Sequence, residues 1–204
     1  MRRRAPACLL TCAALAAGAP AAAEEAWTWN ASASWFLLPD DDNFVLPIVT
    51  ARRDGLHLEA RYNYEDRYTG SLFGGWTFEG GSTLEWEAIP MVGAVVGAID
   101  GIAPGLTLTL SWKQVSLYSE NEYVFVLADH TENFYYNWSE LTWDPLDWLS
   151  AGVATQRTRV YETDRDIQRG LMVRFTWSRY SATGYWFNPG GDDHFGILSF
   201  AAEF

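Results

Sequence analysis

The chain has 204 residues with a formal net charge of -12, and 16% of the residues are aromatic, among them 11 Trp. This acidic balance argues against nucleic acid as a partner, because phosphate binding requires an excess of basic side chains. Both cysteines, Cys8 and Cys12, lie near the N-terminus, so the rest of the chain offers no disulfide framework and no thiolate metal ligand. We expect no cofactor and no metal site.

The N-terminus is predicted to be a cleaved signal peptide. Arginines at positions 2–4 precede an apolar run, and three alanines before Glu24 fit a cleavage site. The alternative, a lipoprotein anchored through Cys12, fits less well because the apolar run before this cysteine is short. We expect residues 1–23 to be removed, which leaves a formal charge of about -15. Residues 24–204 are expected to form one domain.

Turn-forming residues divide the remaining chain into short segments. Glycine, proline, asparagine and aspartate recur between apolar stretches, as at Asp54-Gly55 and Pro189-Gly190. They predict about twelve strands, over residues 27–38, 44–52, 56–66, 71–79, 82–98, 104–113, 115–128, 132–143, 147–161, 168–179, 182–188 and 193–204. Ten strands result if segment 115–128 joins its neighbour, and eight would require unusually long connections.

Apolar and polar residues alternate along most of these segments. Odd positions from 27 to 37 are Trp, Trp, Ala, Ala, Trp and Leu, whereas even positions from 28 to 34 are Thr, Asn, Ser and Ser. The same split recurs over 56–65, 106–113 and 171–178. This period of two, with aromatic residues at both ends of the apolar faces, is typical of strands that cross a bilayer in a closed barrel. A soluble sandwich would also alternate, but without such regular aromatic ends.

The last segment ends in an aromatic residue. One of its faces reads Gly196, Leu198, Phe200, Ala202 and Phe204. A strand of this kind resembles the C-terminal strand of Gram-negative outer-membrane β-barrels. The resemblance implies an all-β protein of the outer membrane, a transmembrane antiparallel up-and-down β-barrel. It also implies that Phe200 and Phe204 form an assembly signal for periplasmic chaperones and the barrel-assembly machinery.

Residues on the polar parity are expected to face the barrel lumen. The predicted pore-lining set is Glu59, Arg61, Asn63, Glu65, Glu79, Glu85, Glu87, Lys113, Glu120, Glu122, Tyr135, Asn137 and Arg174. Carboxylates outnumber basic groups in this set, so the lumen is expected to be acidic and to attract cations. Alternatively, these charges pair with one another and fill the barrel as a polar core.

Three functional hypotheses follow. The first is a small pore for cations or small neutral solutes. Small monomeric porins for acidic sugars are similar in length, but their lumens are basic, so an acidic substrate is not implied. The second is a plugged barrel with a structural or interaction role. The third, a lipid hydrolase, requires a hydroxyl next to an imidazole. Since no serine follows His57, His130 or His194 at the spacing of outer-membrane lipid hydrolases, we expect no catalytic residue and no enzyme activity.

Two charged clusters lie at the predicted outer rim. Asp40, Asp41 and Asp42 are either a solvated acidic loop or oxygen ligands for a divalent cation, and the run lacks the spaced ligands of a calcium loop. Arg157 and Arg159 continue an outward parity and are expected to contact lipopolysaccharide phosphates, unless they pair with acidic residues of the next turn. We expect a monomer surrounded by outer-membrane lipid.

Residues 92–104 are too apolar for an ordinary outer loop. The segment either folds inward as a constriction or continues as a long strand of small residues. The sequence leaves both open.

Overall fold

The computed structural model describes residues 26–127, 132–158 and 167–204. The predicted signal peptide, His130 and Arg159 lie outside these ranges. The strands are β1 (Thr28–Leu37), β2 (Phe44–Arg53), β3 (Leu56–Tyr62), β4 (Thr69–Trp76), β5 (Phe78–Gly80), β6 (Glu85–Gly97), β7 (Gly101–Trp112), β8 (Val115–Val126), β9 (Phe134–Leu146), β10 (Leu149–Arg157), β11 (Gln168–Trp177), β12 (Tyr180–Phe187) and β13 (Phe195–Glu203).

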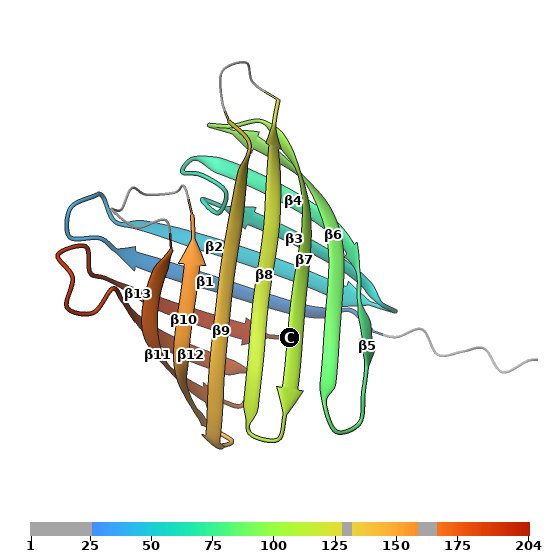
Figure 1. Ribbon diagram of the computed structural model, residues 1–204. Coiled ribbons are helices and arrows are strands. Elements are labelled where there is room, and N and C mark those ends of the chain that lie inside the picture. Colours follow the sequence, from blue (N-terminus) through green and yellow to red (C-terminus); the bar gives the residue numbers. More distant parts are fainter. Residues whose placement is uncertain (1–25, 128–131, 159–166) are drawn as a thin grey trace, which may run out of the picture.

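The strands form one antiparallel sheet that closes on itself (Figure 1). Except for β4 and β5, each strand pairs with the next along the chain, and β1 pairs with β13 from Asn30↔Glu203 to Leu37↔Gly196. Strands β4 and β5 both pair with β6 and occupy one position in the wall, interrupted at Thr77. The wall therefore has twelve positions, and the predicted all-β barrel of twelve strands is confirmed.

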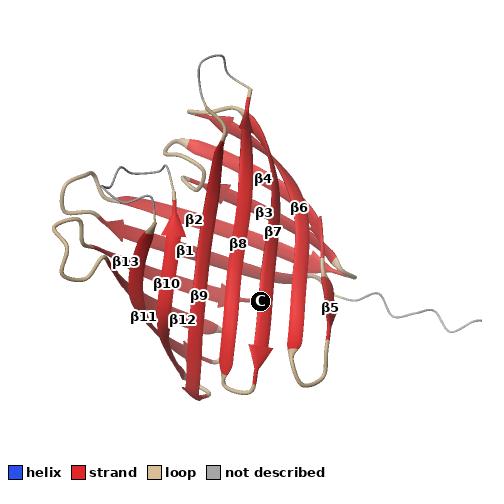
Figure 2. Cartoon of the chain, viewed as in Figure 1, coloured by secondary structure: helices blue, strands red, loops and turns tan. Residues whose placement is uncertain are grey.

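The connections show which end of the barrel faces the periplasm. At one end the turns at 54–55, 113–114, 147–148 and 178–179 have two residues each. The turn Asp54-Gly55 adopts left-handed φ angles of 52° and 83°, as tight hairpins require. The connection 81–84 at this end has four residues, whereas the connections 38–43, 63–68 and 188–194 at the other end are longer (Figure 2). Since outer-membrane barrels have short periplasmic turns, the two-residue turns mark the periplasmic end.

Segment 92–104 does not fold into the lumen. Strand β6 continues to Gly97, and strand β7 begins at Gly101. The two strands pair as far as Val95↔Gly101. Of the two alternatives left open by the sequence, the long strand of small residues is observed. Strand β3 in contrast ends earlier than predicted, because Asn63 takes a left-handed φ of 59° and its side chain accepts a hydrogen bond from the Tyr68 amide.

The outward face of the wall is apolar, with aromatic residues towards both ends. Trp112, Trp143 and Trp177 are exposed near the periplasmic turns, and Tyr62 and Phe125 near the other end. This is the belt and double aromatic girdle of a barrel in lipid. None of the described residues forms a helix long and apolar enough to cross a membrane.

Two apolar clusters fill part of the interior towards the extracellular end. The larger cluster contains Phe36, Leu46, Tyr64, Tyr136, Ala154, Met172, Tyr185, Phe187, Phe195 and Ile197. The smaller one contains Phe73, Met91, Val95, Ile99, Ala103, Val124 and Phe134. Inward-facing residues of this half therefore pack against one another across the lumen, as in the core of a soluble protein.

Candidate functional site

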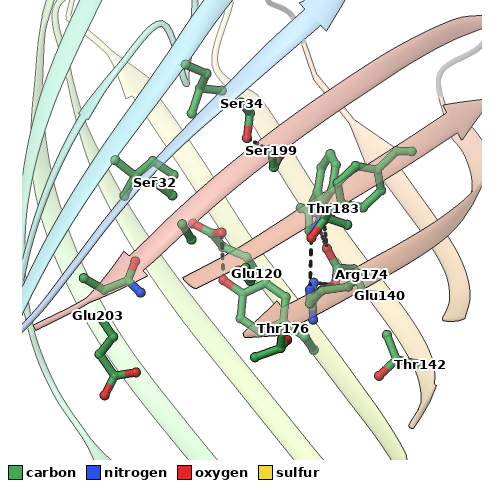
Figure 3. Close-up of a pocket in the computed structure, with 18 of the residues that line it drawn as sticks. Ser32, Ser34, Glu120, Glu140, Thr142, Arg174, Thr176, Thr183, Ser199 and Glu203 are labelled. Carbon is green, nitrogen blue, oxygen red and sulfur yellow. Dashed lines mark hydrogen bonds and ion pairs between the residues drawn. The ribbon is translucent and has the colours of Figure 1, made fainter. Parts of the chain in front are cut away.

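A large cavity lies inside the barrel, below the larger apolar cluster. It has a volume of about 650 Å³. Ser178, Arg179 and Glu203 line it beside the periplasmic rim, whereas Phe36 and Tyr136 line it at the apolar cluster. We call this cavity the vestibule. Figure 3 shows several of its lining side chains pointing into the interior from neighbouring strands.

Many side chains of the vestibule wall carry hydroxyl groups. These side chains include Ser32, Ser34, Thr109, Ser116, Tyr118, Thr142, Thr176, Ser181, Thr183 and Ser199. Ser34 and Ser199 hydrogen-bond to each other at 2.6 Å across the β1–β13 junction (Figure 3). Hydroxyls both donate and accept, so this wall suits water and neutral polar solutes as well as ions.

A charged pair spans the vestibule wall. The Arg174 Nη2 atom on β11 lies 2.5 Å from Glu140 Oε2 on β9 (Figure 3). Tyr185 donates to the other carboxylate oxygen at 2.6 Å, and Trp138 Nε1 donates to it at 3.0 Å. The strand between them, β10, presents Ala154 opposite Glu140, and this small side chain leaves the guanidinium room to cross.

A second charged group joins opposite sides of the lumen. The guanidinium of Arg61 on β3 lies 2.5 Å from Glu59, 2.6 Å from Glu120 and 2.8 Å from Glu122. The two last carboxylates belong to β8, which is separated from β3 in the wall by β4, β6 and β7. The Arg61 side chain is fully buried and lies over the rings of Tyr64 and Phe73, at 4.1 Å and 4.3 Å. We call Arg61 and these three glutamates the cross-brace.

Glu65 extends the cross-brace from the loop after β3. Its carboxylate lies 3.9 Å from Arg61 and accepts a hydrogen bond of 2.6 Å from Ser71. Burial raises the pKa of the Glu65 carboxyl, against the opposing effects of Arg61 and Ser71. Four carboxylates therefore surround a single guanidinium.

The cross-brace continues to the periplasmic mouth as a chain of contacts. Glu59 pairs with His57 at 2.9 Å, His57 accepts from Arg52 at 3.2 Å, and Arg52 pairs with Glu87 at 3.0 Å. Two further cavities, of about 490 and 370 Å³, lie along this side. Glu79, Glu85 and Glu87 line the first, and His57, Glu59 and Glu120 are among the residues that line the second.

Most of the residues predicted to face the lumen lie on the inner face. These are Glu59, Arg61, Glu65, Glu79, Glu85, Glu87, Glu120, Glu122 and Arg174. Two others lie in turns: Asn63 donates to the Val45 carbonyl, and Lys113 is exposed with its ammonium 4.7 Å above the Trp112 ring. Their predicted position in the lumen is wrong, because each has a left-handed φ that ends its strand.

Tyr135 and Asn137 lie on the outer face, which also contradicts the prediction. Their neighbours Tyr136, Trp138 and Glu140 face the interior, so alternation places the odd positions of β9 outside. The prediction fails because polar residues were expected to face inward, and the outer face of this strand is itself polar. The apolar residues Leu141 and Trp143 are exposed and define the outer face of β9. Alternation from these two residues identifies Glu140 as an interior residue.

The remaining charged and histidine residues have simpler surroundings. Asp41 pairs with Arg67 at 2.7 Å, so the acidic run closes one outer loop onto another, and Arg157 is exposed on the outer face. His194 contacts the Gly191 carbonyl at 3.0 Å in an exposed turn, and the ring of His57 contacts Arg52 and Glu59. Neither arrangement is that of a serine–histidine nucleophile.

Comparisons with known proteins found similar folds among solved structures. No family model and no curated protein match the sequence. The KdgM porin in complex with disordered oligogalacturonate matches with a TM-score of 0.61 at 11% identity, over 87% of this chain and 99% of that one. A second KdgM porin structure matches with a TM-score of 0.58 at 11% identity, over 87% and 98%. Acinetobacter baumannii Omp33 matches over 89% and 98% of the chains, at 11% identity and a TM-score of 0.47.

These similarities, at such low identity, concern the fold. A closed antiparallel barrel satisfies all its backbone groups within the wall, and its apolar belt with two aromatic girdles fits lipid on the outside. The closed barrel and its apolar belt agree with the localisation predicted from the sequence, the outer membrane of a Gram-negative bacterium. The chain has the fold of the small outer-membrane β-barrel porins.

Proposed function

We propose that this protein is an outer-membrane pore with an acidic lumen, which passes cations or small neutral solutes. The observation that carries the proposal is the vestibule, a cavity of about 650 Å³ that is lined by hydroxyl groups and leads to the cross-brace. A barrel with a purely structural role gains nothing from a hollow of this size, because an unfilled interior forgoes packing.

Charge supports cations over anions. The basic groups of the interior, Arg52, Arg61, Arg174 and Arg179, are outnumbered by its carboxylates, which include Glu59, Glu79, Glu85, Glu87, Glu120, Glu122, Glu140 and Glu203. Three of the carboxylates, Glu79, Glu85 and Glu87, gather at the periplasmic mouth. Fixed negative charge in a narrow channel with low-dielectric walls raises the local concentration of cations. The KdgM structure contains oligogalacturonate, an acidic oligosaccharide, whereas the carboxylates here would repel such a chain.

A gate is part of the proposal. Between the vestibule and the extracellular side lie the cross-brace and the two apolar clusters. A solute passes only if side chains of this region move apart. The ion pairs of Arg61 connect β3 with β8 across the lumen, so their rearrangement would widen the passage at its narrowest charged part.

The test is single-channel recording in a planar bilayer under a salt gradient. We expect discrete conductance steps with a reversal potential that favours cations. Glu85→Gln with Glu87→Gln should lower the cation preference, whereas Asp147→Asn, in an exposed periplasmic turn, should leave it unchanged. Anion preference, or equal effects of the two variants, would contradict the acidic-pore proposal.

The alternative is a barrel closed by its own side chains, with a structural or interaction role. It is favoured by the buried apolar clusters, which include Phe187 at 0% exposure and Val124 at 0%. A folded, heat-modifiable protein without conductance steps at any applied potential would support this alternative.

We further propose that the partners of the barrel are lipopolysaccharide and the assembly machinery. Arg157 and Arg169 are exposed on the neighbouring strands β10 and β11, near their extracellular ends. Their guanidinium groups suit the phosphates of lipopolysaccharide there. At the opposite end, Phe204 exchanges two backbone hydrogen bonds with Trp29, of 2.8 and 3.0 Å, at the seam between β13 and β1.

Deleting Phe204 should impair assembly, because it removes the last pair of hydrogen bonds at the seam. The fraction of heat-modifiable protein in outer-membrane extracts measures this effect. Leu198→Ala, which keeps the hydrogen bonds of the seam but alters the same outward face outside the predicted assembly signal, is the matched comparison and should insert normally. Unchanged insertion of the truncated chain would contradict the role of Phe204.

A further inference from the structure

The lipid-facing surface carries a polar patch on β8 and β9. The outward residues of β8 are, in order, Val115, Leu117, Ser119, Asn121, Tyr123 and Phe125, so two polar residues interrupt an apolar series. On β9 the outward residues are Tyr135, Asn137, Ser139, Leu141 and Trp143. The register pairs Ser119 with Ser139 and Asn121 with Asn137. The four polar side chains therefore form a compact square on the outside of the wall.

Hydrogen bonds connect the members of this polar patch. The hydroxyls of Ser119 and Ser139 lie 2.9 Å apart, and Asn121 donates to Ser119 at 3.0 Å. Asn137 donates to Asn121 Oδ1 at 3.0 Å, and the Tyr135 hydroxyl donates to the same oxygen. The patch is thus an ordered network of neutral donors and acceptors rather than a few scattered polar residues.

The patch lies within the apolar belt. Asn121 is six residues from Val115, which is about 20 Å along a tilted strand. Below it lie the exposed Trp112 and Trp143, and above it the exposed Phe125. The neighbouring strand β7 presents Ile102, Pro104, Leu106, Leu108, Leu110 and Trp112 outward. Lipid phosphates lie outside the girdles, so this network faces hydrocarbon when the barrel is alone in the bilayer.

Hydrocarbon cannot satisfy the remaining hydrogen-bonding capacity of these groups. The Asn137 amide group already donates to Asn121, to Ser139 and to the Glu120 carbonyl, at 3.0, 3.2 and 3.0 Å. The Asn121 amide group donates within the patch to Ser119 only, and the hydroxyls keep further lone pairs. Polar groups left without partners in an apolar medium cost free energy, which favours an arrangement that covers them. Small polar residues at a membrane-embedded surface also allow two backbones to approach closely.

We propose that the polar patch of β8 and β9 is the contact surface between two copies of this chain. A second copy places the same neutral donors and acceptors at the same depth in the membrane. Related by a two-fold axis along the membrane normal, the two patches exchange hydrogen bonds in a self-complementary contact, and the flanking Leu106 and Leu141 pack around it. The proposal departs from the monomer expected from the sequence, and it does not depend on pore function.

Cysteine cross-linking in outer membranes tests the proposal. The chain has only Cys8 and Cys12, both within the predicted signal peptide, so the unaltered chain shows the background. Ser119→Cys should give an oxidant-dependent dimer on a non-reducing gel. Ala33→Cys, outward-facing and exposed on β1, is the control and should stay monomeric. Absence of the Ser119→Cys dimer, capture of a different envelope protein, or equal dimer from both variants would overturn the proposal.

A second measurement separates association from folding. Asn121→Leu with Asn137→Leu replaces the network by side chains that suit lipid, so the barrel should remain heat-modifiable. Light scattering in detergent should show the dimer dissociation constant raised about tenfold or more, which corresponds to ~1.4 kcal/mol. A folded variant that associates as strongly as the unaltered chain would overturn the proposed contact.

Discussion

The extracellular and periplasmic halves of the lumen are made by the same strands but differ in their contents. In the extracellular half, aromatic and aliphatic side chains pack face to face, as in the stacked rings of Phe187 and Phe195 with centroids 5.0 Å apart. In the periplasmic half, hydroxyls and a few charged groups surround a cavity. The difference indicates that one half supplies internal packing, which allows the other half to remain hollow.

The cross-brace lies between these halves, and its removal should have the largest effect. Arg61→Met leaves Glu59, Glu120 and Glu122 close together without their shared counter-charge. Breaking a buried ion pair by removing one partner costs about 3–5 kcal/mol, so we expect little folded barrel. Urea unfolding in detergent, followed by heat modifiability, measures the loss.

Arg52→Met is the matched control, because Arg52 also pairs with a glutamate but its side chain is 41% exposed. An exposed pair contributes about 0–1 kcal/mol. If both variants lose the same stability, the cross-brace is no more than a surface ion pair.

The next effect concerns the packed half. Phe187→Ala removes a fully buried ring that contacts Phe195, Trp138 and Tyr185. Deleting a buried phenylalanine side chain costs about 3–5 kcal/mol, towards the lower end where water can fill the space. If the apolar cluster closes the pore, the surviving barrel should also show higher conductance.

Phe175→Ala, on the outer face at 53% exposure, is the control, and its effects on stability and conductance should both be smaller. Conductance that is unaltered in a folded Phe187→Ala barrel would show that the larger apolar cluster is not the barrier to solutes.

Sequence periodicity predicted the wall of the barrel but not the contacts across it. Strand number and most strand bounds follow from alternation, because lipid outside and a polar interior impose opposite requirements on successive residues. The contacts of Arg61 with Glu120 and Glu122 join β3 to β8, and the sequence does not indicate which strands face each other across a lumen. Alternation alone also fails at Asn137, where the outward face is polar.

A smaller effect is expected in the vestibule. Glu140→Gln removes the counter-charge of Arg174, whose side chain is 31% exposed. Hydrogen bonds to charged groups contribute about 1.5–3 kcal/mol, and solvent access lowers the loss for this pair to the bottom of that range or less. The free guanidinium should also weaken cation preference in bilayer recordings.

Glu203→Gln is the comparison, since Glu203 lines the same cavity near the rim. If Glu140→Gln lost as much stability as Arg61→Met, the vestibule would be as tightly packed as the cross-brace. That result would contradict the division of the lumen into a packed half and a hollow half.

The smallest effect should come from the hydroxyl pair Ser34 and Ser199, and it tests whether the vestibule contains water. In a wet vestibule, water replaces the partner lost in Ser34→Val, so the free energy of unfolding changes by less than about 0.5 kcal/mol. Ser71→Val, where a buried hydroxyl donates to Glu65, should cost about 1–3 kcal/mol because no water replaces the bond. The two variants remove the same chemical group from opposite halves of the lumen. If both lose about 1–3 kcal/mol in urea unfolding, water does not replace the lost bond at Ser34, and the vestibule is dry.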